Sequence, residues 1–227
     1  MTAPEPATSA PPPSAACSPL RPALPAPASP AAAAPAPLAR HLAGPLDDAS
    51  APVLVLSHGI TDSAACWAEA VDRWSAAGYR IVALDARGHG DSPRWDAEDL
   101  ANQATAGARL AADLETTLED LRVHGLRPSP HAPDAGALTA PLAVVGHSMG
   151  GVTGLDVAAR RPDLVDAAIA EDPAFTTPAW NRLLRLGAFR QVREMKSIAA
   201  DPRARFEKET RENPTWSHRE VRASVEA

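Results

Sequence analysis

Short apolar runs alternate along the chain with longer stretches whose leucines and alanines recur at helical spacing. An apolar run of four to eight residues predicts a buried strand, and apolar residues three or four positions apart predict one face of a helix. Helices are expected over residues 97–123 and 152–161. Strands are expected over residues 52–56, 79–84, 141–145 and 165–170. Strands that alternate with helices predict an α/β fold built on a parallel sheet.

The run that ends at Val145 leads directly into Gly146-His147-Ser148-Met149-Gly150-Gly151 and then into a predicted helix. A sharp strand-to-helix turn holds a serine in a strained conformation and lifts its hydroxyl out of the sheet, toward a base. Gly146 and Gly150 lack the Cβ atoms that would collide in such a turn. The segment predicts a nucleophile elbow with Ser148 as the candidate nucleophile, although a glycine-rich turn with a surface serine would show the same pattern.

A second candidate segment is Ser57-His58-Gly59-Ile60-Thr61, which follows the first predicted strand. Acyl transfer places negative charge on the former carbonyl oxygen, and a backbone N–H aimed at this atom lowers the barrier by about 3 kcal/mol. We expect the N–H groups of Ile60 and Met149 to form this oxyanion hole, with His58 and Gly59 supporting the loop. An ordinary turn at the end of a strand is the alternative interpretation.

Two further segments follow predicted strands, Asp85-Ala86-Arg87-Gly88-His89-Gly90-Asp91-Ser92 and Glu171-Asp172-Pro173-Ala174-Phe175. Together with His58-Gly59 and the elbow, they make residues 50–180 similar to the α/β-hydrolase family of esterases, lipases, C–C hydrolases and haloperoxidase-like enzymes. The resemblance implies a mostly parallel sheet flanked by helices, and a catalytic triad of serine, acid and histidine in this chain order. It also implies that His89 belongs to a structural turn.

In this family the acid usually follows the seventh strand and the histidine the eighth, whereas the predicted strands here end with the family's sixth. Beyond Phe175 the sequence is typical of a lid, with an amphipathic helix expected over residues 180–189 and no later strand. The catalytic core is therefore expected to be incomplete at its C-terminal end. Asp172 is the candidate acid, because some family members carry the acid at the end of the sixth strand. The alternative is a strand-end residue that lines the pocket or caps the lid.

None of the seven histidines is a good candidate for the general base, which must come within hydrogen-bond reach of the serine. His58 belongs to the oxyanion loop, and His147 should point away from the pocket that Ser148 faces. The other histidines lie in a structural turn, in the Pro-rich connection 124–140, before the first predicted strand or in the lid-like tail; they are His89, His124, His131, His41 and His218.

The first 45 residues have the composition of a disordered extension. Thirteen of the 24 prolines fall there, interleaved with alanine and serine, and such a segment buries too little apolar surface to order itself. It has no basic cluster and no continuous apolar stretch, so it is not predicted to be a secretory signal. The expected organisation is an extension over residues 1–45, a partial hydrolase core over 46–175 and a lid-like or cap-like helical segment over 176–227. Residues 38–42 are the part of the extension that could instead pair as an early strand.

Composition excludes several classes of function. The net charge of −6, with arginines scattered among carboxylates, argues against a nucleic-acid surface. No apolar stretch has the ~18 residues of a membrane span. Cys17 and Cys66 lack the spacing of a metal knuckle or a disulfide framework, so a reducing cytoplasm is the expected compartment. No metal or other cofactor is expected. The expected partner is a small-molecule substrate, and the oligomeric state is left open.

The leading interpretation is a serine-dependent hydrolase that cleaves an ester or related acyl substrate through an acyl-enzyme. Members of the family that open epoxides or displace halides carry an aspartate at the elbow, whereas this chain carries Ser148. Serine members also include C–C hydrolases, lyases and perhydrolases, which the elbow does not distinguish. The alternative of a different class is a truncated, non-catalytic remnant or a binding module that kept the elbow.

Overall fold

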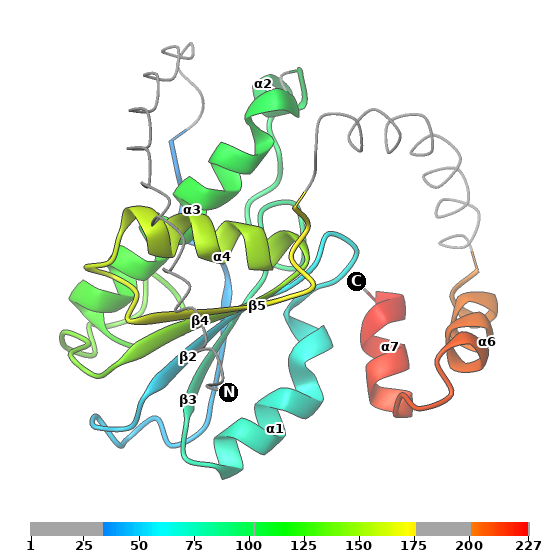
Figure 1. Cartoon of the computed structure of the whole chain (residues 1–227), viewed down its shortest axis with the longest axis horizontal. Coiled ribbons are helices and arrows are strands. Elements are labelled where there is room, and N and C mark those ends of the chain that lie inside the picture. The colour runs from blue at the N-terminus through cyan, green and yellow to red at the C-terminus, as the bar shows by residue number, and fades with distance from the viewer. Residues whose placement is uncertain (1–33, 102, 176–200, 227) are drawn as a thin grey trace, which may run out of the picture. The chain divides into compact units, whose positions relative to one another are not determined.

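The computed structural model describes residues 34–101, 103–175 and 201–226. Five strands form one sheet in the order β1-β3-β2-β4-β5 (Figure 1). β1 is antiparallel to β3, and the other neighbouring pairs are parallel. The strands are β1 (Arg40–Ala43), β2 (Val53–Ser57), β3 (Arg80–Leu84), β4 (Leu142–His147) and β5 (Ala167–Glu171). The mostly parallel α/β fold expected from the sequence is confirmed.

The register of the central strands places their carboxyl ends side by side. Ser57, the last residue of β2, is paired with Leu84 of β3 on one side and with Gly146 of β4 on the other. In open α/β sheets, ligands bind outside the carboxyl ends of the strands. The loops that follow Ser57 and Leu84 and the turn that follows β4 are therefore brought to one edge of the sheet.

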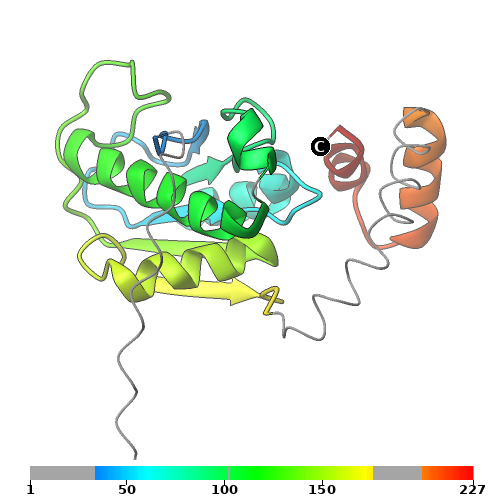
Figure 2. The same ribbon diagram turned by 90° about the horizontal axis from the view of Figure 1, so that it is seen from above.

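Helices cover both faces of the sheet (Figures 1 and 2). On one face, Leu114 and Leu118 of α3 pack with Val157 of α4 against Val55 and Val144 of the strands. On the other face, η1 and α1 pack on side chains of β2, β3 and β4. The helical elements up to α4 are η1 (Ala64–Trp67), α1 (Ala68–Ala76), α2 (Ala97–Ala101), η2 (Gln103–Thr105), α3 (Ala106–His124) and α4 (Met149–Arg160). The one helix expected over residues 97–123 is thus divided into three elements.

The sheet begins earlier than residue 46, the boundary expected from the sequence. Strand β1 pairs with β3 from Arg40 opposite Leu84 to Ala43 opposite Ile81. Leu38 is 5 % exposed in the core, and its N–H donates to the Thr117 hydroxyl at 2.9 Å. The expected boundary was wrong because the composition of 45 residues conceals a four-residue strand, and an edge strand needs pairing on one side only. Residues 1–33 of the predicted extension lie outside the described residues.

Two helices follow residue 200, α6 (Pro202–Glu212) and α7 (His218–Glu226). Asp201 caps α6 by accepting hydrogen bonds from the N–H groups of Arg203 and Ala204, and a proline occupies the first turn, as is common at helix starts. The described part of the segment predicted to be helical, 201–226, contains no strand. The helix expected over residues 180–189 lies outside the described residues.

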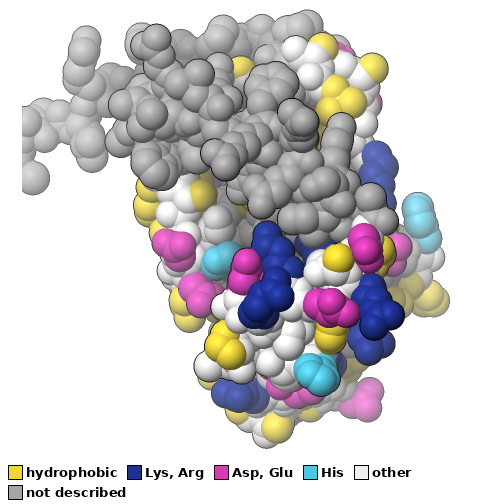
Figure 3. Space-filling model, turned by 90° about the vertical axis from the view of Figure 1, so that its right-hand side faces the viewer, with side chains coloured by type: hydrophobic (Ala, Val, Ile, Leu, Met, Phe, Trp, Pro, Cys, Tyr) yellow, Lys and Arg dark blue, Asp and Glu magenta, His cyan; other side chains and the backbone are white. Residues whose placement is uncertain are grey.

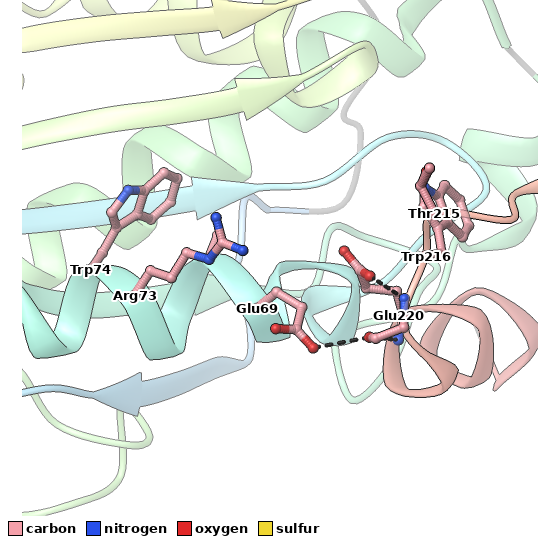
Figure 4. Close-up of a pocket in the computed structure, with 8 residues that line it drawn as sticks. Glu69, Arg73, Trp74, Thr215, Trp216 and Glu220 are labelled. Carbon is pink, nitrogen blue, oxygen red and sulfur yellow. Dashed lines mark hydrogen bonds between the residues drawn. The ribbon is translucent and has the colours of Figure 1, made fainter.

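Helix α7 lies against η1 and α1. Its side chains Val221 and Ala223 are buried. The Ser217 hydroxyl, just before α7, donates to Glu69 of α1 at 2.9 Å, and Glu69 points toward this segment in Figure 4. Arg219 forms an ion pair with Asp72 of α1. Apolar burial and polar contacts together hold α7 beside the start of α1.

The face that carries α6 and α7 shows basic and acidic side chains intermixed rather than gathered by sign (Figure 3). Exposed ion pairs such as Arg203 with Glu207 contribute to this pattern, and each is worth at most about 1 kcal/mol. Within the described residues, no helix combines the length and apolar character that crossing a bilayer requires.

Candidate active site

Ser148 occupies the turn between β4 and α4 with φ 49° and ψ −109°. A non-glycine residue with positive φ carries a strain of about 1–3 kcal/mol, and such strain gathers at functional sites. The glycines on either side are required by close packing. A Cβ on Gly146 would lie 2.3 Å from the Gly150 carbonyl oxygen, and one on Gly150 would lie 2.2 Å from the Ser57 carbonyl oxygen. The turn therefore has the geometry of a nucleophile elbow.

Neighbouring backbone holds the elbow on both sides. The Ser148 N–H donates to the Glu171 carbonyl at the end of β5 (2.9 Å), and the Ser148 carbonyl accepts from the Ala174 N–H (3.2 Å). The Gly150 N–H donates to the His58 carbonyl after β2 (3.1 Å). These bonds connect the strained residue to the ends of two other strands, so its conformation is fixed by the fold around it.

His58 is fully buried. It joins the predicted oxyanion loop, residues 57–61 after β2, to the loop that follows β3. Its Nε2 accepts from the Ala86 N–H at 2.9 Å, so the ring proton is on Nδ1, which donates to the Gly59 carbonyl at 2.7 Å. Burial lowers the pKa of His58 below its ordinary value, because the charged ring would lose solvation. His58 is thus held as the neutral Nδ1–H tautomer.

The Gly59 carbonyl accepts a second hydrogen bond, from the Asp62 N–H at 3.2 Å. In a trans peptide the C=O and N–H point in opposite directions, and no peptide bond of the described residues is cis. Anchoring this carbonyl therefore also sets the direction of the Ile60 N–H. Among the described residues, neither this N–H nor that of Met149 has a hydrogen-bond acceptor. Both remain available to an oxyanion, and their role stays a prediction.

A cavity of about 250 Å³ lies at the carboxyl ends of β4 and β5. The oxyanion loop and η1 form one wall, the ends of the two strands another and α7 a third; the lining residues are Asp62, Cys66, Trp67, His147, Glu171, Trp216, Glu220 and Ser224. His147 Nδ1 lies 3.9 Å from an Asp62 carboxylate oxygen. Burial raises the pKa of Cys66 to about 12, so this thiol is protonated at neutral pH and is no rival nucleophile.

Asp172 adopts φ 40°, also in the left-handed region, immediately after the Glu171 carbonyl that binds the elbow. No described contact joins its carboxylate to a histidine, and its role as the triad acid stays a prediction. Within residues 34–101, 103–175 and 201–226, no histidine forms a hydrogen bond with Ser148. The structure thus brings the elbow and the oxyanion loop together and leaves the proton acceptor unassigned.

Sequence reasoning missed the part played by the loop after β3. The buried Asp85 carboxylate accepts from the Ala64 N–H (2.8 Å) and the Asp91 N–H (3.1 Å), and it contacts His41 Nε2 (3.1 Å). Burial raises the pKa of Asp85, but these hydrogen bonds outweigh it and hold the pKa below its ordinary value. The pattern Asp-x-Arg-Gly-His-Gly at a strand end was the available signal for a polar link to the oxyanion loop.

Comparisons with known proteins show which family the chain is similar to. Residues 48–226 match the hydrolase family described as serine aminopeptidase, S33. The sn-1-specific diacylglycerol lipase ABHD11 of Mus musculus is 32 % identical over 154 residues, which cover 66 % of this chain and 41 % of the lipase. The monoacylglycerol lipase of Mycolicibacterium smegmatis is 34 % identical over 124 residues, which cover 54 % of this chain and 38 % of that protein. The chain spans about two fifths of the length of these curated relatives.

Among solved structures, the thioesterase domain from the curacin biosynthetic pathway superposes with a TM-score of 0.53 at 21 % identity. The match covers 81 % of this chain and 60 % of that chain, and it shows the fold alone. The family match extends over most of the chain and includes the elbow, the oxyanion loop and α7. The chain belongs to the α/β-hydrolases, in the family described as serine aminopeptidase, S33.

Proposed function

We propose that Ser148 is the nucleophile of a hydrolase that cleaves an ester or related acyl substrate through an acyl-enzyme. The observation that carries the proposal is the backbone of Ser148 itself, with φ 49° between two glycines that tolerate no Cβ. A surface serine in an ordinary turn has no need of that strain. The names of two relatives, a diacylglycerol lipase and a monoacylglycerol lipase, support an ester as the substrate.

The chemistry would proceed in two steps. The Ser148 oxygen attacks the carbonyl carbon, the carbonyl π electrons move to its oxygen, and the N–H groups of Ile60 and Met149 donate to the oxyanion. Collapse of this intermediate expels the alcohol, and water then attacks the acyl-enzyme to release the acid and restore the serine. The serine proton passes to a base and then to the leaving alcohol. In this proposal Asp172 is the acid that would orient the base.

A non-catalytic binding module of the same fold is the second candidate. The observation that favours it is the absence of a histidine hydrogen-bonded to Ser148 among the described residues. C–C hydrolase, lyase and perhydrolase chemistry would use the same nucleophile and oxyanion loop, so turnover of an ester is needed to separate them from ester hydrolysis.

A fluorophosphonate probe tests the proposal, because it reacts with an activated serine and leaves a stable adduct. We expect labelling of the chain, mapped by peptide mass spectrometry to Ser148, and its loss in Ser148→Ala. Ser50→Ala, at an exposed position, is the matched control and should label like the parent chain. Labelling that persists in Ser148→Ala would place the nucleophile elsewhere, and a folded chain without any labelling would favour the binding module.

A further inference from the structure

Three hydrogen bonds join the loop that follows β3 to the oxyanion loop and to η1, the helical turn that comes after it. The Ala86 N–H donates to His58 Nε2 (2.9 Å), and the Ala64 N–H donates to the Asp85 carboxylate (2.8 Å). The third bond joins His89 Nε2 to the Ile60 carbonyl at 2.9 Å. The first two fix the segments on either side of the oxyanion loop, and only the third reaches its tip.

The His89 ring can act on Ile60 only as a donor. The Ile60 carbonyl at Nε2 and the Arg87 carbonyl at Nδ1 (3.1 Å) are both acceptors, so the bond to Ile60 requires a proton on Nε2. The ring also contacts His58 edge to face, with centroids 4.9 Å apart at 70°. These contacts hold the imidazole against the loop.

The turn that carries His89 has little freedom. The glycines that flank it have φ 87° at Gly88 and φ 44° at Gly90, and a Cβ on Gly90 would lie 2.1 Å from the Asp85 carboxylate. Arg94 donates to the carbonyls of both glycines. The imidazole is therefore presented to the oxyanion loop from a fixed backbone.

The tip of the oxyanion loop has no comparable support from packing, because the Ile60 residue is 67 % exposed. The peptide before Ile60 is anchored through the Gly59 carbonyl by His58 and Asp62. The peptide after it is anchored by His89 alone among the described residues. The first anchor fixes the peptide plane that carries the Ile60 N–H, and the bond from His89 fixes the next plane. The two together hold Ile60, with its N–H, in place between them.

We propose that His89 is a positioning residue for the oxyanion hole. Its Nε2–H donates to the Ile60 carbonyl and so keeps the Ile60 N–H aimed at the oxyanion. The inference rests on the proposed function, because it assigns the Ile60 N–H to the reaction. His89 itself touches no reacting atom, and its effect passes through the loop backbone. A small misplacement of a donor can cost up to about 10²-fold in rate.

Three substitutions separate this role from a general structural one. His89→Gln places an amide N–H near the position of Nε2, whereas His89→Asn places one near Nδ1, where it reaches the Arg87 carbonyl but not Ile60. His89→Ala removes both bonds. We expect His89→Ala and His89→Asn to lower kcat for p-nitrophenyl acetate at least about tenfold, with KM little changed. The rate of fluorophosphonate labelling should fall by a similar factor. In His89→Gln both rates should stay within about threefold of those of the parent chain. His131→Asn, at an exposed histidine of another loop, should have no effect.

Nitrogen NMR supplies a readout that does not depend on catalysis. Long-range ¹H–¹⁵N spectra of the parent chain should show His89 with its proton on Nε2, and the Ile60 amide signal should move in Ala and Asn but little in Gln. A His89 ring with its proton on Nδ1 alone would overturn the proposal. Equal rate losses in His89→Ala, His89→Asn and His89→Gln would also overturn it, and so would unchanged rates in all three variants. If the parent chain neither reacts with the fluorophosphonate nor hydrolyses p-nitrophenyl acetate, the proposed function fails. The position of the His89 proton and the shifts of the Ile60 amide signal still decide whether His89 anchors the loop.

Discussion

The backbone N–H of Gly150 donates to the carbonyl oxygen of His58 at 3.1 Å, which joins the first turn of α4 to the end of β2. This bond brings the elbow and the oxyanion loop into contact, although 92 residues separate the two partners in the sequence. It is possible only because the residue at 150 has no side chain.

Replacing Gly150 by alanine should therefore destabilise the protein strongly. The new Cβ would lie 2.2 Å from the Ser57 carbonyl oxygen, which is backbone and cannot turn aside, so we expect a loss of about 3 kcal/mol in the free energy of unfolding. Gly107→Ala is the matched control, because nothing lies within 4 Å of its Cβ position and it sits in α3. That variant should gain about 0.5–1 kcal/mol. Urea unfolding measures both, and equal effects would contradict the close packing at the elbow.

The strain at Ser148 predicts an order of stability among its variants. Alanine keeps the positive φ and its cost, whereas glycine adopts φ 49° freely. Ser148→Gly should therefore be more stable than Ser148→Ala by about 1 kcal/mol, after the higher entropy of glycine in the unfolded chain is counted. Thermal melts of the two inactive variants make the comparison. An alanine variant that equals or exceeds the glycine variant would mean that the elbow is unstrained.

The lowered pKa of His58 predicts a dependence of stability on pH. In the unfolded chain the ring takes up a proton near pH 6.5, whereas the folded ring stays neutral to lower pH because it is buried and accepts from the Ala86 N–H. Its contribution to stability is thus complete above pH 6.5 and is lost as the pH falls through 6.5 toward the folded pKa. The loss has a slope of up to about 1.4 kcal/mol per pH unit.

An NMR titration of the His58 ring checks this directly, because its carbon-bound proton should not titrate near pH 6.5. Urea unfolding at several pH values between 5 and 8 gives the free energy of unfolding as a function of pH. This free energy should change less steeply with pH in His58→Gln than in the parent chain, and His131→Gln should keep the pH dependence of the parent chain. A His58 signal that titrates at 6.5 would refute the neutral tautomer.

The central strands of the fold were predictable because each is an apolar run that needs no distant partner to be detected. β2, β3, β4 and β5 lie within a few residues of their predicted positions. β1 was considered only as an alternative, an early strand over residues 38–42, since a short strand that contains Arg40 and His41 has no apolar run. Its Arg40 is buried and pairs with Asp120 of α3, which only the assembled fold reveals.

At the candidate site, the sequence predicted the residues whose local backbone is special and missed those that act across loops. The glycines around Ser148 indicate a turn that requires them, so residues 146–150 alone are enough to predict the elbow. The bond from His89 to Ile60 depends instead on how two loops fold beside each other. The pattern Asp-x-Arg-Gly-His-Gly marks the loop that carries His89, but it does not identify Ile60 as the partner.

The position of β1 predicts how truncation affects folding. Removing residues 1–33 should leave the melting temperature unchanged, whereas removing residues 1–45 also deletes β1 and buried Leu38. A buried leucine is worth about 1.5–3 kcal/mol, so we expect the longer deletion to lower Tm by about 5–10 °C. Equal melting temperatures for the two truncated chains would show that β1 contributes nothing to the sheet.

The most direct test of the central claim is the detection of an acyl-enzyme on Ser148. The chain would be mixed with p-nitrophenyl acetate, quenched in acid and digested, and the peptide that contains the elbow would be examined by mass spectrometry. We predict acetylation of Ser148 in the parent chain and none on this peptide in Ser148→Ala. The modification should form slowly unless a base is present, because the oxyanion hole and substrate binding alone give roughly 10³–10⁴-fold over water. Ester turnover without acetylation of Ser148, or acetylation at another residue that accounts for the turnover, would contradict the account.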